Sequence, residues 1–146
     1  MSFPVFRGNN MKILLIDGQG GKLGKELCES ILARFKDIEL VAVGTNTIAT
    51  SAMIKGGAKL CATGENAVVV NCRTADIIVG PIGIVIADSM LGEITPDMAL
   101  AVSQSNAVKI LIPANRCNNL IAGVDGMNVS DMINDALKKI ENIIRK

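Results

Sequence analysis

Three glycines with a regular spacing carry the strongest chemical signal in the sequence. Gly18, Gly21 and Gly24 form the pattern G-x-x-G-x-x-G, which follows the apolar run MKILLID and opens a helical pattern. Glycines in this position let the backbone turn tightly and bring the N–H groups of the helix start close to a phosphate, whose charge the helix dipole favours. The pattern therefore predicts a binding loop for a nucleotide or dinucleotide. Another anionic small molecule and a purely structural turn remain alternatives.

The loop is expected to contact its ligand mainly through the backbone. Lys22 adds a cation that can form a charge-assisted contact to phosphate. The stricter pattern G-x-G-x-x-G fails from Gly18, because Leu23 stands where it requires a glycine. We expect the backbone to approach the ligand at Gly21, so that a larger side chain there would abolish binding without unfolding the protein. The expected cofactor-binding residues of the loop are Gly18, Gln19, Gly20, Gly21, Lys22, Leu23 and Gly24.

The end of the second predicted strand should lie beside this loop. Dinucleotide sites usually place an Asp or Glu there, which binds the ribose hydroxyls. Here the chain has Thr45 and Asn46, which can donate hydrogen bonds to a ribose or accept them from it but supply no carboxylate. No Arg is present at this strand end to bind a 2′-phosphate. The expected cofactor is NAD(P) or an adenine nucleotide. The choice among NAD, NADP and a mononucleotide stays open.

Two more loops should reach the same edge of the sheet, because ligands of open α/β sheets bind beyond the carboxyl ends of the strands. The predicted strands ADIIVG and VKILIP are followed by GPIG and ANRCNN. Glycines permit close backbone approach, and an arginine offers five donors to a phosphate or carboxylate. The expected binding residues of these loops are Gly80, Pro81, Gly83, Asn115 and Arg116. For Gly83 and Arg116, a turn and a solvated charge are the structural alternatives.

Catalytic residues are harder to assign, because the chain has no His, Tyr or Trp. A Tyr-x-x-x-Lys pair for proton transfer is therefore excluded. The candidate bases are Glu65, Asp88 and Glu93, and the conceivable nucleophiles are Ser89 and Cys117. A helix cap for Asp88 and a solvated loop charge for Glu93 are the favoured structural interpretations. We expect a binding or regulatory module, with a small enzyme that acts on a phosphorylated or nucleotide substrate through a carboxylate base as the alternative.

Apolar periodicity predicts how the chain positions these loops. Apolar runs alternate with amphipathic stretches, which is typical of parallel strands connected by helices. Thr95, Pro96 and Asp97 agree on one helix start, and Asn128 or Ser130 opens the last helix. The predicted fold is α/β, a three-layer Rossmann-like, doubly wound and mainly parallel sheet of about five strands. Residues 11–146 should form one domain, and residues 1–10 an N-terminal extension that we expect to be poorly ordered.

Composition excludes several classes of function. The formal charge of +1 provides no basic field for nucleic acid and no polybasic patch for a membrane. The most apolar stretch, DIIVGPIGIVIADSML, is interrupted well before the length of a membrane span, about 18 residues. The cysteines are widely spaced and no histidine is present to complete a zinc site, so we expect no metal. A cytoplasmic protein with reduced thiols is the expected result.

A positive mean hydropathy and an apolar stripe on the last helix predict self-association. A small domain with few charges leaves apolar surface that a second copy can cover. We expect a homodimer or a dimer of dimers. The expected contact is the edge of the stripe formed by Ile140, Ile143 and Ile144, and the segment IVIADSML is the alternative.

Two resemblances add to this interpretation. The glycine spacing is similar to the loop of extended short-chain dehydrogenases and other Rossmann-type NAD(P)-binding proteins, but the similarity covers only the loop and its flanking strand and helix. The chain from Met11 onward resembles a family of small bacterial Rossmann-like proteins of unknown function. The resemblance lies in IDGQGGKLG, AVGTNTIATSAM, TGENAVVVNCR, GPIGIVIADSMLGEITPDMA and ILIPANRCN. It implies the fold, and it places residues 1–10 outside the domain, without implying an activity.

Overall fold

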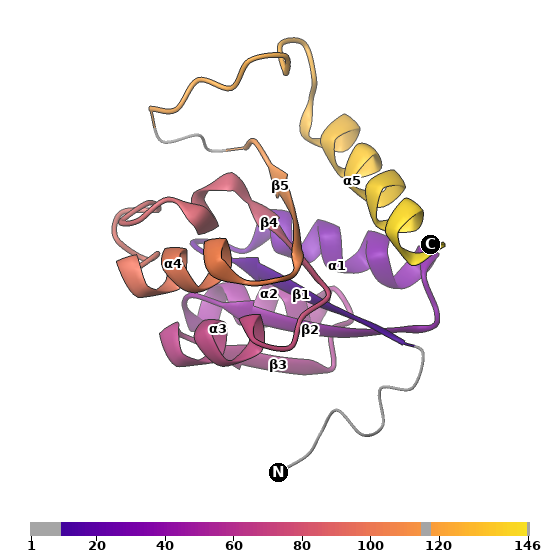
Figure 1. Cartoon of the computed structure of the whole chain (residues 1–146), viewed down its shortest axis with the longest axis horizontal. Coiled ribbons are helices and arrows are strands. Elements are labelled where there is room, and N and C mark those ends of the chain that lie inside the picture. The colour runs from indigo at the N-terminus through magenta and orange to yellow at the C-terminus, as the bar shows by residue number, and fades with distance from the viewer. Residues whose placement is uncertain (1–9, 115–117, 146) are drawn as a thin grey trace.

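The computed structural model describes residues 10–114 and 118–145, and in this part the strands form one parallel sheet. The strand order is β3-β2-β1-β4-β5, with every neighbouring pair parallel (Figure 1). The sheet consists of β1 (Met11–Asp17), β2 (Ile38–Gly44), β3 (Leu60–Thr63), β4 (Ile77–Pro81) and β5 (Val108–Ile112). This order and the alternation with helices define a Rossmann-like fold, which confirms the predicted fold class.

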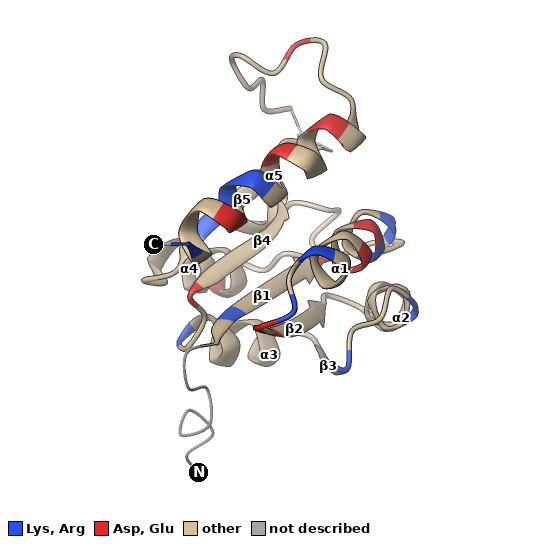
Figure 2. Cartoon of the chain, turned by 90° about the vertical axis from the view of Figure 1, so that its right-hand side faces the viewer, with Lys and Arg blue, Asp and Glu red and all other residues tan. Residues whose placement is uncertain are grey.

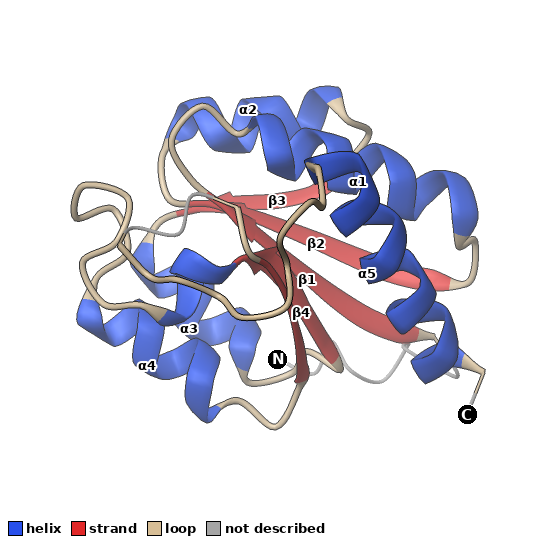
Figure 3. Ribbon diagram, turned by 90° about the horizontal axis from the view of Figure 1, so that it is seen from above, coloured by secondary structure: helices blue, strands red, loops and turns tan. Residues whose placement is uncertain are grey.

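Helices cover both faces of the sheet. One face is covered by α1 (Lys22–Arg34), α2 (Thr47–Lys55) and α5 (Val129–Ile144), and the other by α3 (Glu65–Cys72) and α4 (Pro96–Gln104) (Figure 3). A short 3-10 helix, η2 (Ile82–Val85), follows β4. Since the connections on the two sides of β1 and β4 run in opposite directions, the topological switch point lies between these two strands.

Strand β1 shows why an apolar run without polar alternation becomes the centre of such a sheet. Ile13 and Leu15 face the layer of α1, α2 and α5, whereas Leu14 and Ile16 face the layer of α3 and α4. All four side chains are fully buried. Burial on both faces requires apolar residues at every position, which is the pattern of a central parallel strand.

Local side chains set the helix starts as the sequence predicted. The Thr95 hydroxyl accepts a hydrogen bond from the Met98 N–H at 3.1 Å, and Pro96 is the first helical residue of α4. Asn128 opens α5, where its side-chain oxygen accepts from the Asp131 N–H at 2.8 Å. These caps satisfy N–H groups that have no partner within the helix.

Helix α5 packs on the sheet, and this corrects one expectation. Ile140 has no exposed surface and belongs to the core between α5 and the sheet, so its predicted place at an exposed edge is wrong. Ile143 and Ile144 are partly buried against the same core. The stripe on this helix is wide because its central residues fill the domain interior. Self-association remains a prediction.

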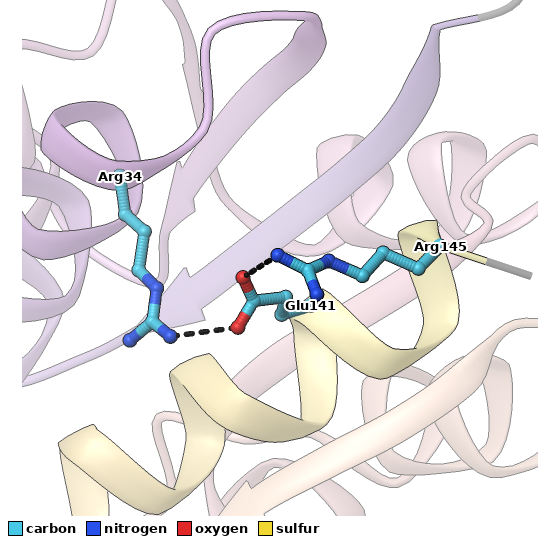
Figure 4. A network of polar contacts seen from close by, with 3 residues as sticks. All are labelled: Arg34, Glu141 and Arg145. Carbon is cyan, nitrogen blue, oxygen red and sulfur yellow. Dashed lines mark hydrogen bonds and ion pairs between the residues drawn. The ribbon is translucent and has the colours of Figure 1, made fainter.

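An ion-pair cluster joins the end of α5 to α1. The Glu141 carboxylate lies 2.8 Å from the Arg34 guanidinium and 2.9 Å from that of Arg145 (Figure 4). The three side chains are partly exposed, so we expect the cluster to contribute little more than about 1 kcal/mol. Along α1 and α5, basic and acidic residues are interspersed rather than gathered by sign (Figure 2).

Candidate functional site

The glycine loop lies at the carboxyl end of β1, at the switch point beside the end of β4. A small cavity of about 130 Å³ is lined by residues 18–23 together with Asp17, Pro81 and Met90. The loop and Pro81, predicted separately from two strand ends, therefore meet at one place. Open α/β sheets bind their ligands at this point.

The three spaced glycines are required by packing within the protein. A Cβ on Gly18 would lie 2.6 Å from the Thr45 hydroxyl, and one on Gly24 would lie 2.8 Å from the Asp17 Cβ. Gly21 has a φ of +76°, and its Cβ would lie 2.7 Å from the Cα of Ala49 in α2. The expectation that a larger side chain at Gly21 would leave the fold intact is therefore wrong, because this side of Gly21 contacts α2.

Gly20 differs from these glycines, because no atom of the described residues lies within 4 Å of the position of its Cβ. It is exposed and lines the cavity. A side chain at Gly20 would enter the space above the loop without displacing any part of the chain that the structure describes. Gly20 is thus the position where the open side of the loop can be altered without a cost in packing.

The first turn of α1 leaves backbone donors open at this cavity. The N–H groups of Gly20, Lys22 and Leu23 make no hydrogen bond within the described part of the chain. Among residues 10–114 and 118–145, no side chain caps the helix, whose N-cap residue is Gly21. Unpaired N–H groups at a helix start carry partial positive charge, so they favour an anion.

Asp17, which the sequence interpretation missed, holds the first turn of α1 through a buried hydrogen bond. Its side chain is 5% exposed, and its Oδ2 accepts a hydrogen bond from the Gly24 N–H at 2.6 Å. Burial raises the pKa of Asp17, while hydrogen bonds from the N–H groups of Gly24 and Gly18 lower it and the Glu93 charge raises it further. The available signal was an acidic residue ending an otherwise apolar strand directly before a glycine.

We expect Asp17 to make the protein less stable as the pH rises. Because its pKa is raised above the ordinary value of 3.8, the folded state keeps a proton that the unfolded state releases. The free energy of unfolding should therefore fall as the pH rises through the interval between these two pKa values. Asp17→Asn keeps an oxygen for the Gly24 N–H and removes the charge, so it should gain stability over the wild type across that interval. Urea unfolding from about pH 4 to about pH 7 measures this difference, and a difference independent of pH would contradict it.

Glu93 reaches the other side of the loop and joins residues that are distant in the sequence. Its Oε1 accepts hydrogen bonds from the Thr45 hydroxyl at 2.6 Å, the Gln19 N–H at 2.8 Å and the Asn46 side-chain amide at 2.9 Å. Burial acts to raise the pKa of Glu93, but hydrogen bonds from Thr45, Gln19 and Asn46 outweigh it, so the pKa is lowered. The structure thus brings the predicted residues Thr45 and Asn46 together with one of the three candidate carboxylates.

The segment between β4 and α4 that carries Glu93 has an unusual backbone. Asp88, Met90 and Leu91 have φ values of +65°, +57° and +57°, a region that residues other than glycine rarely adopt. Met90 is buried, and its sulfur would lie 2.7 Å from a Cβ on Gly18. The Ser89 hydroxyl donates to the Gly83 carbonyl at 2.5 Å. These contacts fix the segment against the glycine loop, and they explain Ser89 and Gly83 as structural residues.

Three other predicted residues, Glu65, Gly80 and Asp88, do not line the cavity. Glu65 accepts a hydrogen bond from the Thr95 hydroxyl at 2.5 Å and lines a groove between α3 and α4. Asp88 is exposed, and a Cβ on Gly80 would lie 2.4 Å from the Ile16 carbonyl oxygen, so Gly80 serves the packing of β4 on β1. The predictions for Asn115, Arg116 and Cys117 concern residues outside the described part of the chain, and the same holds for residues 1–9 of the predicted extension.

Other hollows are larger than this cavity but have different chemistry. An apolar groove of about 480 Å³ lies between β5 and α5, and the groove between α3 and α4 measures about 650 Å³. A third, of about 530 Å³, lies between α1 and α2, and Gly20 and Lys22 of the glycine loop contribute to its wall together with Lys25 and Lys55. Of these three grooves in the described part of the chain, the third adjoins the open N–H groups.

Two absences hold for the part of the chain that the structure describes. None of its helices has the length and apolar character needed to cross a membrane. Within residues 10–114 and 118–145, no cluster of three His, Cys, Asp or Glu side chains is placed to hold a metal ion.

Comparison with known proteins identifies a family. The model of a family described as "Domain of unknown function (DUF3842)" matches residues 12–145. No curated protein and no solved structure matches the chain.

Proposed function

We propose that this chain, which belongs to the DUF3842 family, binds a nucleotide or dinucleotide and places one of its phosphates at the start of α1. The observation that carries the proposal is the set of open N–H groups of Gly20, Lys22 and Leu23 beside the cavity. An anion there would accept hydrogen bonds from these groups and gain from the helix dipole.

The size of the cavity supports a phosphate as the part of the ligand that enters it. Pockets that hold a whole small-molecule ligand measure roughly 300 to 1,000 Å³. A cavity of about 130 Å³ therefore suits a phosphate group rather than a complete nucleotide. The rest of the nucleotide would lie on the adjoining surface, along the groove between α1 and α2 or beside the end of β2. Lys22 borders both spaces and would contribute a cation to the phosphate.

The role that fits best is that of a binding or regulatory module. Of the three candidate bases, Asp88 is exposed in a turn, Glu65 is bonded to Thr95 near α4, and Glu93 is engaged by three donors. Within residues 10–114 and 118–145, none of them is hydrogen-bonded to the candidate nucleophile Ser89, whose hydroxyl donates to the Gly83 carbonyl. Binding therefore accounts for the described geometry without a chemical step.

The proposal is tested by Gly20→Glu, which should prevent binding without unfolding the protein. The new carboxylate would stand in the open space above the loop and repel a phosphate, while no packed atom is displaced. Calorimetry with NAD⁺, NADP⁺ and ATP should show that the wild type binds at least one of them. The variant should lose at least about tenfold in affinity, or about 1.4 kcal/mol.

A matched control separates the local charge from the net charge. Gln104→Glu adds the same negative charge at the exposed end of α4, on the opposite face of the sheet, and should leave the affinity unchanged. The melting temperature of Gly20→Glu should stay close to that of the wild type. Equal affinities for Gly20→Glu and the wild type would refute phosphate binding at the loop.

A further inference from the structure

We propose that Glu93 recognises the ribose hydroxyls of the bound nucleotide and selects against a ligand that carries a 2′-phosphate. This inference rests on the proposed function, because it assigns the specificity of the same site. It gives Glu93 a binding role, in place of the base that the sequence alone suggested.

The Glu93 carboxylate lies beside the end of β2. The end of β2, where an acidic residue commonly binds the ribose, has Thr45 and Asn46 and no acid of its own. The Glu93 Oε1 lies 2.6 Å from the Thr45 hydroxyl and 2.9 Å from the Asn46 amide. A residue that follows Thr45 by 48 positions in the chain thus supplies the missing carboxylate in space.

The two oxygens of this carboxylate differ in their surroundings. Oε1 accepts three hydrogen bonds, including one from the Gln19 N–H of the glycine loop at 2.8 Å. Oε2 has no partner in the described part of the chain, and the side chain is partly exposed. The donors to Oε1 therefore hold the group in place, while Oε2 stays available to accept hydrogen bonds from a ligand.

Gln19 links the Glu93 carboxylate to the wall of the phosphate cavity. Gln19, whose N–H donates to Glu93, belongs to the cavity wall beside the open N–H groups. In a nucleotide the ribose is covalently bonded to the phosphate, so a phosphate in the cavity brings its ribose close to this carboxylate. A ribose would donate hydroxyl hydrogens to Oε2, whereas a 2′-phosphate would bring a second negative charge to an ionised carboxylate.

The anchoring of the segment that carries Glu93 supports a fixed position for this group. Three residues other than glycine in the segment adopt left-handed backbone angles, which are unfavourable unless the surroundings impose them. Met90 packs against Gly18, and Ser89 bonds to Gly83, so the segment is held at both strand ends. A carboxylate held in this way can discriminate, because it does not move away from an unsuitable ligand.

The first test uses the wild-type protein and two pairs of ligands. Calorimetry should show that NAD⁺ binds at least about tenfold more tightly than NADP⁺, and that ATP binds at least about tenfold more tightly than 2′-deoxy-ATP. Equal affinities within both pairs would overturn the role of Glu93 while leaving phosphate binding intact. Failure to bind any of the four ligands would overturn the proposed function itself, and with it this inference.

The second test uses Glu93→Gln, which keeps an oxygen to accept from Thr45 and Gln19 but removes the charge. NAD⁺ should bind about tenfold more weakly to the variant, NADP⁺ should bind equally well or better, and the preference between them should disappear. A gain by the same factor for both coenzymes would instead make Glu93 a competitor of the phosphate, which contradicts the inference. A melting temperature close to that of the wild type verifies that the variant is folded.

Discussion

Gly21→Ala is expected to lower the free energy of unfolding by about 3 kcal/mol, whereas Gly20→Ala should leave it unchanged or raise it by up to about 1 kcal/mol. The two glycines are neighbours in the same loop, and the substitution adds one methyl group at each. The difference arises from what the methyl group would meet. The two variants therefore compare the same added methyl group at a packed position, Gly21, and at an open position, Gly20.

The cost at Gly21 has two sources. The added Cβ would lie 2.7 Å from the Cα of Ala49 and 2.8 Å from the Cβ of Ala52, so α1 and α2 would have to move apart. The backbone at Gly21 also has a φ of +76°, which costs an alanine about 1 to 2 kcal/mol. At Gly20, a Cβ meets nothing within 4 Å in the part of the chain that the structure describes, and alanine restricts the unfolded chain more than glycine does.

Urea denaturation of the two variants and the wild type in parallel measures this difference. A loss at Gly21 of less than about 1 kcal/mol would mean that α2 can yield at this contact, and that the glycine is not required by packing. A loss at Gly20 as large as that at Gly21 would contradict the open space assigned to it. Either result would remove the basis for using Gly20 as the probe of ligand binding.

Ile140→Asp should destabilise the fold by about 4 kcal/mol or more, which approaches the whole stability of many small domains. The side chain is fully buried between α5 and the sheet, where a carboxylate would lose its hydration without a partner. The effect is one of folding, so any change in self-association of this variant would be secondary. Circular dichroism during thermal unfolding measures it.

Asn142→Asp is the matched control for this prediction. It places the same charge two residues further along α5, at an exposed position. It should shift the free energy of unfolding by no more than about 0.5 kcal/mol. Equal stability of Ile140→Asp and Asn142→Asp would contradict the docking of α5 on the sheet through Ile140.

The elements of the fold could be predicted because their signals are local. The start of α4 is encoded by Thr95 and Pro96 in succession, and β1 by an unbroken apolar run. Such signals lie within one turn or one strand, so they do not depend on how the chain packs.

What could not be predicted depends on long-range contacts. Periodicity predicted the apolar face of α5 but not how deeply each residue on it is buried, so the prediction of an exposed edge at Ile140 is wrong. The spacing of the glycines was recognised, but the neighbour of Gly21 is Ala49 in α2, which no local pattern reveals. The contact between Glu93 and Thr45 at the end of β2 spans 48 residues, so no local pattern reveals that another loop supplies the carboxylate that β2 lacks.

The most direct test of phosphate binding is a titration of the ¹⁵N-labelled wild-type protein with NAD⁺ or ATP, followed by two-dimensional NMR. Phosphate binding at the glycine loop should produce saturable shifts of the amide signals of Gly20, Lys22 and Leu23, because their N–H groups are the ones that would donate to the phosphate. Signals from the groove between α3 and α4 should not move. Unchanged signals from these three amides at about 1 mM of each ligand, or shifts confined to another groove, would contradict the account.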